Sequence, residues 1–288
     1  MSGRSAVVRR LAGQPRVLDA IRAADAWRLA RRLDVLHYVQ RSEPVIVFQM
    51  GKVGSSSVAA SFPTDHHRVV IHTHHLSALR VDEAVSYARA TGLPVRRHFF
   101  HARVAAHNVV ESGRPFKVIS LVREPVGRSV SKFFHDFERF VGCPAEHSDH
   151  SMDEIIEIFL ANEAHIDDEA HWFEHQFEPA LGVDVYAEAF DPAVGSAQFT
   201  AGAGTVLLMR LELDDADKER VIADFLGEPG FTLDSANVGE ARGDGDGYRQ
   251  FKAEAKLPAD YLERKLTSRF ATHFYSADER AAIADRWS

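Results

Sequence analysis

A short apolar run that breaks into a glycine- and serine-rich loop is the feature that most constrains how this chain folds. Residues 45–48, Val-Ile-Val-Phe, suit a buried parallel strand, and Gly51 and Gly54 let the backbone turn after it without a steric penalty from Cβ. The serines at 55–57 then predict the first turn of a helix. A helix N-terminus presents unpaired N–H groups and the positive end of a dipole, and Lys52 adds a point charge. The segment therefore predicts a strand, an anion-binding loop and a helix.

The same loop departs from two common nucleotide-binding motifs. A Walker P-loop requires Gly-x-x-x-x-Gly-Lys-Ser/Thr, but Ile46 stands at the first glycine position and Val53 follows Lys52. No Gly-x-Gly-x-x-Gly occurs at this turn, so the usual dinucleotide signature is missing as well. The sequence therefore disfavours a P-loop kinase.

A second segment, residues 116–134, repeats the order of strand, turn and helix about 70 residues later. Pro125 fits the first turn of a helix, and Val126 and Val130 recur at helical spacing. Arg123 lies at the end of the predicted strand, where a guanidinium supplies a charged fork for phosphate. The chain thus offers two anion sites, each at a strand-to-helix turn.

Together the two segments resemble the donor-binding loops of sulfotransferases that use 3′-phosphoadenosine 5′-phosphosulfate. In that family a lysine-bearing loop after the first strand holds the 5′-phosphosulfate, and an arginine at a later strand end holds the 3′-phosphate with a serine eight positions on. Arg123 and Ser131 match the second pattern. The cofactor-binding residues that the resemblance implies are Gly51, Lys52, Val53, Gly54, Ser55, Ser56, Ser57, Arg123 and Ser131. It also implies in-line displacement at sulfur without a metal, with Lys52 stabilising charge on the bridging oxygen and backbone N–H groups of residues 53–57 holding the phosphosulfate.

Sulfuryl transfer to a hydroxyl needs a group that takes the acceptor's proton, and histidine suits this role near neutral pH. Residues 69–76 predict a second strand that runs into a loop, and Thr-His-His-Leu at 73–76 resembles the histidine context of many cytosolic sulfotransferases. Alternation along the strand lets His72 and His74 point together while His75 turns away. The candidate bases, in order of preference, are His74, His75 and His72, and Glu124 or Asp136 would substitute, because other branches of the family use a glutamate.

Three shorter phrases, at residues 49–55, 172–186 and 273–276, are similar to a bacterial branch described as capsular-polysaccharide-synthesis-type sulfotransferases. This resemblance implies a carbohydrate acceptor. A lipid head group and small phenolic or alcohol acceptors stay open, because no readable motif marks the loops that choose the acceptor. The expected reaction is transfer of a sulfuryl group from 3′-phosphoadenosine 5′-phosphosulfate to an acceptor hydroxyl.

Composition and charge bound the remaining possibilities. The 288 residues are 45% apolar and no linker-like stretch divides them, so we expect a single domain over residues 1–288. The single cysteine precludes an internal disulfide, and no apolar run of about 18 residues and no secretory leader is visible, which favours a cytoplasmic location. A net charge of −8 disfavours nucleic acid and requires any anion site to gather positive charge locally.

The N-terminal segment, residues 1–41, is predicted to be a basic helix. It holds nine arginines against three aspartates. Its apolar residues at helical spacing are Leu18, Ile21, Leu29, Leu33 and Leu36. One interpretation is contact with an anionic membrane surface or partner, and the favoured one is a helix docked on the body with solvated arginines. The three aspartates argue against an organellar transit peptide.

The rest of the chain predicts alternating strands and helices. Helices are expected at 81–91, 97–111, 170–177 and 215–226, a buried strand at 205–211, and capping boxes at Ser151-x-x-Glu154 and Ser276-x-x-Glu279. This order predicts a three-layer α/β/α fold with a mostly parallel sheet, similar to the P-loop-like fold of sulfotransferases.

The C-terminal segment, residues 237–288, is expected to be a helical cover over the site. Arg242, Arg249 and Lys252 fall where sulfotransferases often close a basic segment over the adenosine phosphate. No sharp motif supports any one of them, and solvated surface charge is the favoured interpretation of each.

Two alternatives from other classes stay open. His171-x-x-Glu174-His175 fits the inverted zinc-protease pattern, with two histidines one helical turn apart, and Cys143, His147 and His150 form a second possible metal set. Sixteen histidines make such matches easy by chance, so no metal is expected. The second alternative is a relative that binds an anion without catalysis.

Overall fold

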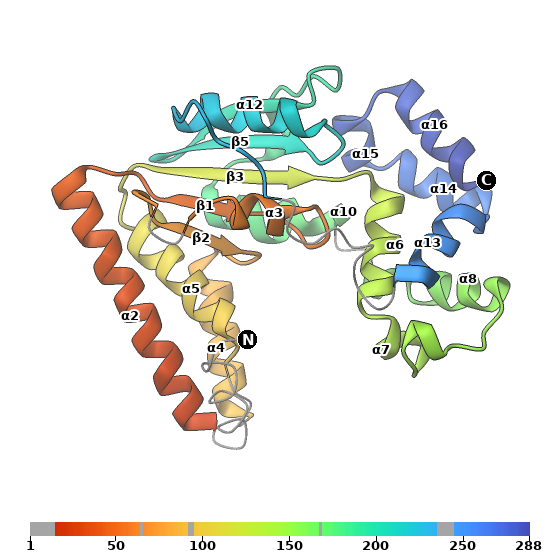
Figure 1. Ribbon diagram of the computed structural model, residues 1–288, viewed down its shortest axis with the longest axis horizontal. Coiled ribbons are helices and arrows are strands. Elements are labelled where there is room, and N and C mark those ends of the chain that lie inside the picture. The colour runs from red at the N-terminus through yellow and green to blue at the C-terminus, as the bar shows by residue number, and fades with distance from the viewer. Residues whose placement is uncertain (1–14, 64–65, 92–94, 167–168, 235–244) are drawn as a thin grey trace.

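The centre of the fold is a five-stranded β-sheet with helices on both faces, the expected three-layer α/β/α arrangement (Figure 1). The computed structural model describes residues 15–63, 66–91, 95–166, 169–234 and 245–288. The strands are β1 (Val45–Phe48), β2 (Val70–Thr73), β3 (Phe116–Val122), β4 (Ser196–Ala201) and β5 (Gly204–Arg210), in the order β2-β1-β3-β5-β4. β4 pairs antiparallel with β5, and the other neighbours are parallel.

Helices connect and cover these strands. The α-helices are α2 (Pro15–Gln40), α3 (Ser55–Ala60), α4 (Ala78–Ala90), α5 (Arg97–Ala105), α6 (Pro125–His135), α7 (Phe137–Val141), α8 (Met152–Ala161), α9 (Glu163–Ile166), α10 (Glu169–Trp172), α11 (Glu178–Leu181), α12 (Asp215–Leu226), α13 (Gly245–Glu254), α14 (Ala259–Leu266), α15 (Arg269–Phe274) and α16 (Ala277–Trp287). Two π-helical segments, η1 (Ala106–Val110) and η3 (Phe173–Phe177), and two 3₁₀ turns, η2 (Ala145–His147) and η4 (Val185–Ala187), complete the chain.

The strand order creates a switch point between β1 and β3. The four residues of β1 are fully buried, as their apolar run predicted, and β1 pairs with β2 on one side and with β3 on the other. The chain therefore passes from β1 to β2 on one side of β1, and the later strands β3, β5 and β4 extend the sheet on the other side. In open α/β sheets a crevice forms at such a point, outside the carboxyl ends of the strands. The loop after β1 and the loop after β3 meet there.

The antiparallel edge strand β4 is the main element that sequence patterning missed. Ser-Ala-Gln-Phe-Thr-Ala at 196–201 has a mixed burial pattern and no run of apolar residues. A two-residue turn joins it to β5, with Ala201 opposite Gly204 and Gly202 at φ +60°. Its pairing with the buried strand β5 therefore decides its structure, because its own composition does not distinguish it from a loop.

Two of the predicted helices change geometry part-way. The helix expected at 97–111 is α5 followed by the π-helical η1, and the helix expected at 170–177 is α10 followed by the π-helical η3. Both predicted capping boxes are confirmed, at Ser151 with Glu154 and at Ser276 with Glu279. A π turn adds a residue to the helical cycle and rotates the side chains that follow it, and periodicity alone does not reveal this.

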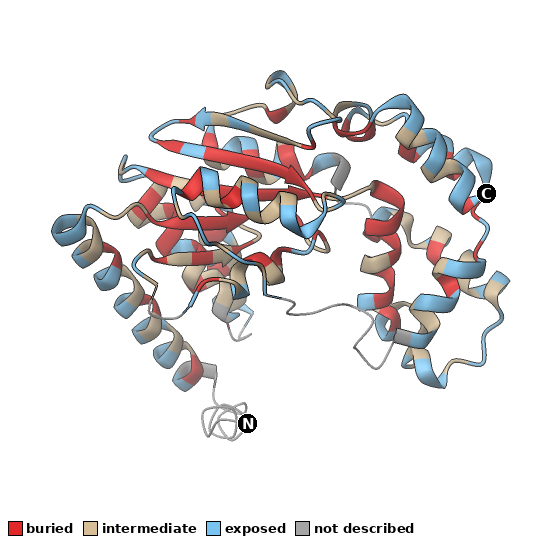
Figure 2. Ribbon diagram, turned by 45° about the horizontal axis from the view of Figure 1, so that its top comes forward, coloured by how far each residue is buried: buried red, intermediate tan, exposed pale blue. Residues whose placement is uncertain are grey.

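Buried apolar side chains form two clusters, one around the sheet and one between α6 and the helices that pack on it. The second cluster joins α6 to α8 and to the C-terminal helices α13, α14 and α16 (Figure 2). Its largest members include Phe133, Phe251 and Trp287. Within the segment after residue 244, α13, α14 and α16 thus share a core with α6, whereas α15 packs in the cluster around the sheet. Of these helices, α13 lines the crevice. The single domain stays a prediction.

The helix α2 packs against α5 through a buried stripe that includes Leu18 and Leu33. Arg114 Nη1 donates to Asp34 Oδ1 at 2.7 Å, which fixes the C-terminal half of α2 to the body. The prediction of a docked helix is confirmed for residues 15–40, and residues 1–14 lie outside the described residues. Within the described parts of the chain, no helix has the length and apolar character needed to cross a membrane.

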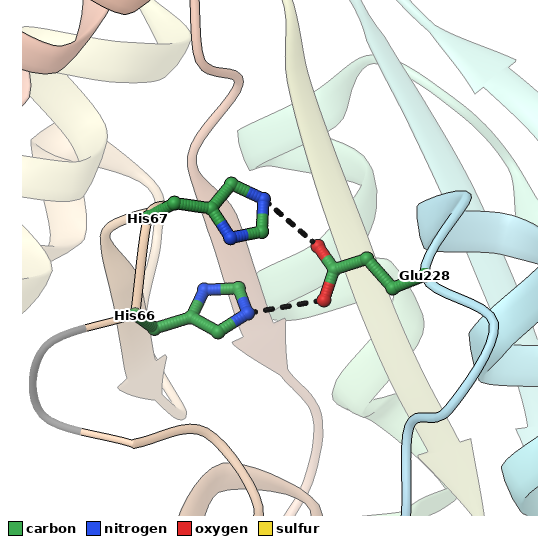
Figure 3. Close-up of side chains that lie close together, drawn as sticks. All are labelled: His66, His67 and Glu228. Carbon is green, nitrogen blue, oxygen red and sulfur yellow. Dashed lines mark hydrogen bonds and ion pairs between the residues drawn. The ribbon is translucent and has the colours of Figure 1, made fainter.

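A cluster of charged side chains fastens the start of β2 to the end of α12 (Figure 3). Arg68 Nε donates to Glu228 Oε1 at 2.9 Å, and the Nε2 atoms of His66 and His67 lie 3.0 and 3.2 Å from the carboxylate oxygens of Glu228. His66 Nδ1 accepts the backbone N–H of Arg68 at 3.1 Å, so the proton of a neutral His66 sits on Nε2 and is donated to Glu228. Burial alone would raise the pKa of Glu228, but the hydrogen bonds from Arg68 and His66 outweigh it and lower that pKa.

Replacing Glu228 with glutamine should lower the free energy of unfolding at pH 7 by about 2 kcal/mol, because hydrogen bonds to a charged group are lost. The pKa of Glu228 in the folded state lies below its ordinary value of 4.5. The stabilisation is therefore complete above that value and is lost as the pH falls through the lowered pKa, so wild type and Glu228→Gln should converge in acid. Urea unfolding at pH 7 and in steps below pH 4.5 measures both effects.

The control for this experiment is Glu157→Gln, on an exposed position of α8. It should change the free energy of unfolding little at either pH. Equal stability of Glu228→Gln and wild type at pH 7, or a gap that does not narrow in acid, would contradict the assignment.

Candidate functional site

A cavity of about 1240 Å³ lies at the switch point of the sheet. The loops after β1, β2 and β3 contribute to its lining, together with α3, α6, η3 and α13. Ten of the eleven residues predicted for the site line it: Gly51, Lys52, Gly54, Ser55, Ser56, Ser57, His74, His75, Arg123 and Ser131. Val53 does not, because its side chain is buried in the core. The fold thus brings together two segments that are distant in sequence, and the roles of these residues stay predictions.

The loop after β1 is left-handed at one of its two predicted glycines, Gly54, and at Lys52, whereas Gly51 has no positive φ. Gly54 has φ +78°, and a Cβ built there would lie 2.5 Å from Leu211 Cδ1. Lys52 also has a positive φ, +73°, although it is not glycine. A lysine in this region is uncommon and costs conformational energy, so the surrounding contacts must hold it there.

Two arginines of the second segment supply those contacts. Arg123 Nη1 donates to the carbonyl oxygen of Lys52 at 3.2 Å, and Arg128 Nε donates to the carbonyl oxygen of Gly51 at 3.2 Å. Arg128 is fully buried in the first turns of α6, and its Nη1 also donates to the carbonyl oxygen of Ile166 at 2.6 Å. The strand end that carries Arg123 is thereby fastened to the loop that carries Lys52.

Arg128 was not identified from the sequence. The available signal was its position in an apolar stretch of helix, between Val126 and Val130. A charged side chain that is buried must have polar partners, so such a position indicates a functional or a structural contact. In this fold Arg128 lines the cavity and positions the loop after β1.

Positive charge gathers in the cavity although the chain as a whole carries −8. Eight lysines and arginines line it against three aspartates. The cations are Lys52, Arg96, Arg123, Arg128, Lys132, Arg139, Lys218 and Lys252, and the aspartates are Asp136, Asp215 and Asp234. A recess lined by one sign of charge concentrates ions of the opposite sign. The local positive potential that an anion site requires is therefore present.

His74 is held as a neutral base with one nitrogen available. Its Nδ1 lies 2.8 Å from the carbonyl oxygen of Gln49, and because a carbonyl can only accept, Nδ1 carries the proton. Nε2 of the neutral ring is then left with a lone pair. Burial lowers the pKa of His74, the hydrogen bond to Gln49 opposes this, and the charges of Lys52 and Arg128 lower it further. The ring therefore stays neutral at pH 7 and can accept a proton.

The other two candidate histidines lie as the strand pattern predicted. His72 and His74 point together with ring centroids 5.4 Å apart, whereas His75 turns to Gln176, with Nδ1 3.3 Å from Oε1. His72 does not line the cavity: its Nε2 lies 3.0 Å from both Gln49 Nε2 and Ser55 Oγ, and burial followed by the charge of His74 lowers its pKa to about 4. Of the three rings, His74 has the geometry that best fits a base.

Glu124 and Asp136, the carboxylates proposed as alternatives to a histidine base, each form a contact with another residue. Glu124 is not among the lining residues, and its Oε1 accepts the N–H of Gly127 at 2.7 Å as the cap of α6. Asp136 lines the cavity and is bonded to Lys132. Burial alone would raise the pKa of Asp136, but the bond from Lys132 and its charge outweigh this and lower it, which makes Asp136 a weak base.

Two details of the serine loop differ from expectation. The N–H of Ser57 donates to the carbonyl oxygen of Gly54 at 3.1 Å, so it is not directed at a ligand. The hydroxyl of Ser55 is bonded to His72, as described above. The bond from Ser57 to Gly54 is the 3₁₀-type bond that often tightens the end of a helix.

The C-terminal segment contributes α13 to the cavity. Tyr248 and Lys252 line it, Arg123 Nη2 lies 3.3 Å from the Tyr248 hydroxyl, and the Lys252 ammonium lies 5.2 Å from the Tyr248 ring. Arg249 is exposed and pairs with Asp246. Arg242 lies outside the described residues. Tyr248 was missed from the sequence, because no spacing relates α13 to the end of β3.

A row of histidines forms another wall of the cavity. His75 stacks near His98 of α5 with ring centroids 6.1 Å apart, and His171 and His175 lie 5.5 Å apart around the start of η3. Trp172 and Gln176 complete this wall. Burial, followed by the charges of neighbouring groups, lowers the pKa of His98 to about 4, so this ring is neutral at pH 7.

The metal sets suggested by the sequence are not gathered into ligand geometry. Within the described parts of the chain, the three-residue group whose ligand atoms lie within 4.8 Å of one another is His66, His67 and Glu228. That group is the ion-pair cluster of Figure 3, where Nε2 of His66 carries a proton. Among the described residues, His171 and His175 belong to no such group, and neither do Cys143, His147 and His150. Glu174, the glutamate of the pattern, faces Arg269 at 3.8 Å.

A family model matches part of the chain. It is NKWYS, described as "Putative capsular polysaccharide synthesis protein", and it matches residues 148–276. A search of curated proteins and a search of solved structures each found no match. The matched span includes the wall formed by η3 and the residues of α13, whereas the loops of Lys52 and Arg123 precede it. The predicted likeness to capsular-polysaccharide proteins is thus supported over this span.

The two glycines Gly54 and Gly113 offer a test of how tightly the loop after β1 is packed. Gly54→Ala should lose about 1–2 kcal/mol of stability from its positive φ, and more because the new methyl displaces Leu211. Gly113→Ala should lose only the stability that a positive φ costs, because its φ is +67° and nothing lies within 4 Å of a Cβ built there.

Urea unfolding of both variants, with and without Leu211→Ala, separates the two contributions. In the Leu211→Ala background the difference between Gly54→Ala and Gly113→Ala should disappear. Equal losses for both variants in the presence of Leu211 would show that the loop is not packed against it.

Proposed function

We propose that this protein is a sulfotransferase that moves a sulfuryl group from 3′-phosphoadenosine 5′-phosphosulfate to a hydroxyl of a carbohydrate. The observation that carries the proposal is that the two segments predicted to bind anions line one cavity. The Lys52 loop follows β1 and the Arg123–Ser131 pair follows β3, and the guanidinium of Arg123 joins them through the Lys52 carbonyl. A donor with a phosphosulfate at one end and a second phosphate at the other requires two such sites at a fixed separation.

The cavity suits a donor of this size and charge. Its volume of about 1240 Å³ exceeds the roughly 300–1,000 Å³ of most small-ligand pockets, which leaves room for a second substrate. Arg123 supplies a planar fork and Ser131 a hydroxyl for one phosphate, and Lys52 with the serine loop supplies donors for the other anion. Tyr248 and Lys252 add a ring and a charge beside Arg123.

The residues would divide the chemistry as follows. The bound donor supplies an electrophilic sulfur with a phosphate leaving group. Nε2 of His74 takes the proton of the acceptor hydroxyl as its oxygen forms a bond to sulfur and the bond from sulfur to the bridging oxygen breaks. Lys52 neutralises the charge that develops on that bridging oxygen, and Arg128 holds the loop so that Lys52 is already in place.

The carbohydrate acceptor rests on the matched family and on the histidine wall. The family model carries capsular polysaccharide synthesis in its description, and its span includes His171, His175 and Gln176. Neutral imidazole and amide groups both donate and accept hydrogen bonds, as sugar hydroxyls require.

Calorimetric titration with adenosine 3′,5′-bisphosphate tests the donor site. Wild type should bind it with a Kd on the order of micromolar and bind adenosine 5′-phosphate more weakly, because Arg123 and Ser131 contact the 3′-phosphate. Arg123→Ala should weaken the bisphosphate by roughly tenfold to a hundredfold, the usual effect of losing a hydrogen bond to a charged group. It should weaken the monophosphate less, because that ligand loses only the fastening of the Lys52 loop.

The control for this titration is Arg220→Ala, an exposed arginine of α12 that pairs with Asp217 away from the cavity. It should bind both nucleotides as wild type does. No binding of the bisphosphate, or equal binding of the two nucleotides, would overturn the proposed donor.

The pH dependence of turnover tests His74. The base must be neutral, so kcat/KM should fall on the acid side as the pH passes through the lowered pKa of His74, with a midpoint below 6.5, the ordinary value for histidine. His74→Gln should lower kcat by roughly a hundredfold to ten-thousandfold and remove the fall of kcat/KM on the acid side. The control is His165→Gln, at an exposed position outside the cavity, which should change neither kcat nor the pH profile.

Donor binding without turnover over a broad panel of carbohydrate acceptors, with no effect of His74→Gln, would support a non-catalytic anion-binding protein. A loss of activity on chelation with stoichiometric zinc would support the hydrolase alternative.

A further inference from the structure

The helix α2 has a second apolar face that points away from the molecule. Nine large apolar side chains are exposed in the described parts of the chain, and six of them belong to α2. These six are Val17, Ile21, Trp27, Val35, Tyr38 and Val39. Trp27 is 62% exposed, Tyr38 73% and Val39 75%. In Figures 1 and 2 α2 runs along the outside of the molecule, so this face is concentrated on one surface element.

Four of the six exposed apolar residues follow one stripe of the helix, the outer stripe, and Trp27 and Val39 lie beside it. Positions 17, 21, 24, 28, 31, 35 and 38 are separated by steps of four and three, and all seven are exposed. Residues at these steps lie on one face of an α-helix. The stripe that includes Leu18 and Leu33 is buried on the opposite side, against α5. A helix that only covers a protein body needs one apolar face, and this helix has two.

The charges on the outer stripe have one sign. Arg28 and Arg31 lie in its middle, and the Arg31 guanidinium lies 5.2 Å from the centre of the Trp27 ring. Asp19 accepts the N–H of Val95 at 3.2 Å and Asp34 accepts from Arg114, so both aspartates face the body. Asp25 pairs with Arg28 at 2.8 Å at the edge of the stripe. The stripe itself therefore carries arginine and no acid.

We propose that the outer face of α2 lies on an anionic lipid surface, with the helix parallel to the plane of the membrane. Tryptophan and tyrosine favour the level of the lipid headgroups, and an apolar helix face with basic residues binds anionic bilayers from the side. Anionic lipid also supplies the negative charge that the stripe lacks. A docked helix with solvated arginines accounts for Arg28 and Arg31, but it leaves the exposure of Trp27, Tyr38 and Val39 unexplained.

A second copy of this chain fits the same face less well. A symmetric contact between two α2 helices would bring Arg28 and Arg31 near the same residues of the partner, and of these two only Arg28 has an acidic partner, Asp25. Like charges placed together in an interface oppose association. The charge of the face therefore favours lipid over another α2.

Vesicle binding with tryptophan fluorescence tests the proposal on the full-length chain. Trp27 is the exposed tryptophan, whereas Trp172 and Trp287 are 5% and 1% exposed, so a blue shift on adding vesicles reports Trp27. Wild type should shift and co-sediment with vesicles of phosphatidylcholine containing phosphatidylglycerol. Binding should weaken as salt is added and should be slight with phosphatidylcholine alone.

Two variants separate the parts of the face. Arg28→Glu/Arg31→Glu should lower the partition onto anionic vesicles more than about tenfold, because both attractive charges become repulsive. Val35→Ser/Val39→Ser should weaken binding to anionic vesicles but should change the salt dependence of that binding less. The control is Val194→Ser/Arg220→Glu, which makes matched changes at exposed positions away from α2 and should bind as wild type does.

Circular dichroism and binding of adenosine 3′,5′-bisphosphate check that each variant is folded. No shift and no sedimentation of wild type with anionic vesicles would overturn the proposal, as would unchanged binding of Arg28→Glu/Arg31→Glu. Light scattering that shows a dimer in wild type and a monomer in Val35→Ser/Val39→Ser would assign the face to a second copy instead.

Discussion

The contact of two guanidinium groups with two consecutive backbone carbonyls holds the cavity together. Arg123 and Arg128, at the end of β3 and the start of α6, donate to the carbonyl oxygens of Lys52 and Gly51. This fixes the loop after β1 against the loop after β3, across the point where the sheet changes direction. It also offsets the cost of the left-handed backbone at Lys52, which without such partners would relax to an ordinary conformation. The position of Lys52 and of the serines that follow it depends on this contact.

Burial is the main cause that lowers the pKa of His74, and the charges of Lys52 and Arg128, which also line the cavity, act in the same direction. A histidine that lay beside carboxylates would instead become protonated and lose its capacity to accept a proton. In the proposed function the same two cations would therefore serve the anion site and help to keep the base neutral. The hydrogen bond from Nδ1 to Gln49 adds orientation and fixes the tautomer.

Charge is distributed over the molecule in two positive regions on a negative body. The cavity gathers eight lysines and arginines against three aspartates, and the outer stripe of α2 carries arginine without acid, in a chain whose net charge is −8. A negative body repels anions in general, so the two positive regions direct them to specific places. In our proposals the first region binds the donor and the second a lipid surface.

The sequence by itself determined the elements whose signals are local. The strand β1, the glycine turn after it, the helix start at Pro125 and both capping boxes depend on neighbouring residues, and the structure confirms them. Ten of the eleven predicted site residues line one cavity, because parallel strands place their carboxyl ends at the same edge of the sheet.

Only the tertiary structure decided what depends on residues distant in sequence. Burial of Arg128 beneath the loop, the tautomer of His74 and the approach of Tyr248 to Arg123 arise from contacts that no spacing encodes. The strand β4 forms because β5 pairs with it. The outward face of α2 is likewise visible only once its other face is seen to be packed, because a sequence with apolar residues on both sides does not say which side is covered.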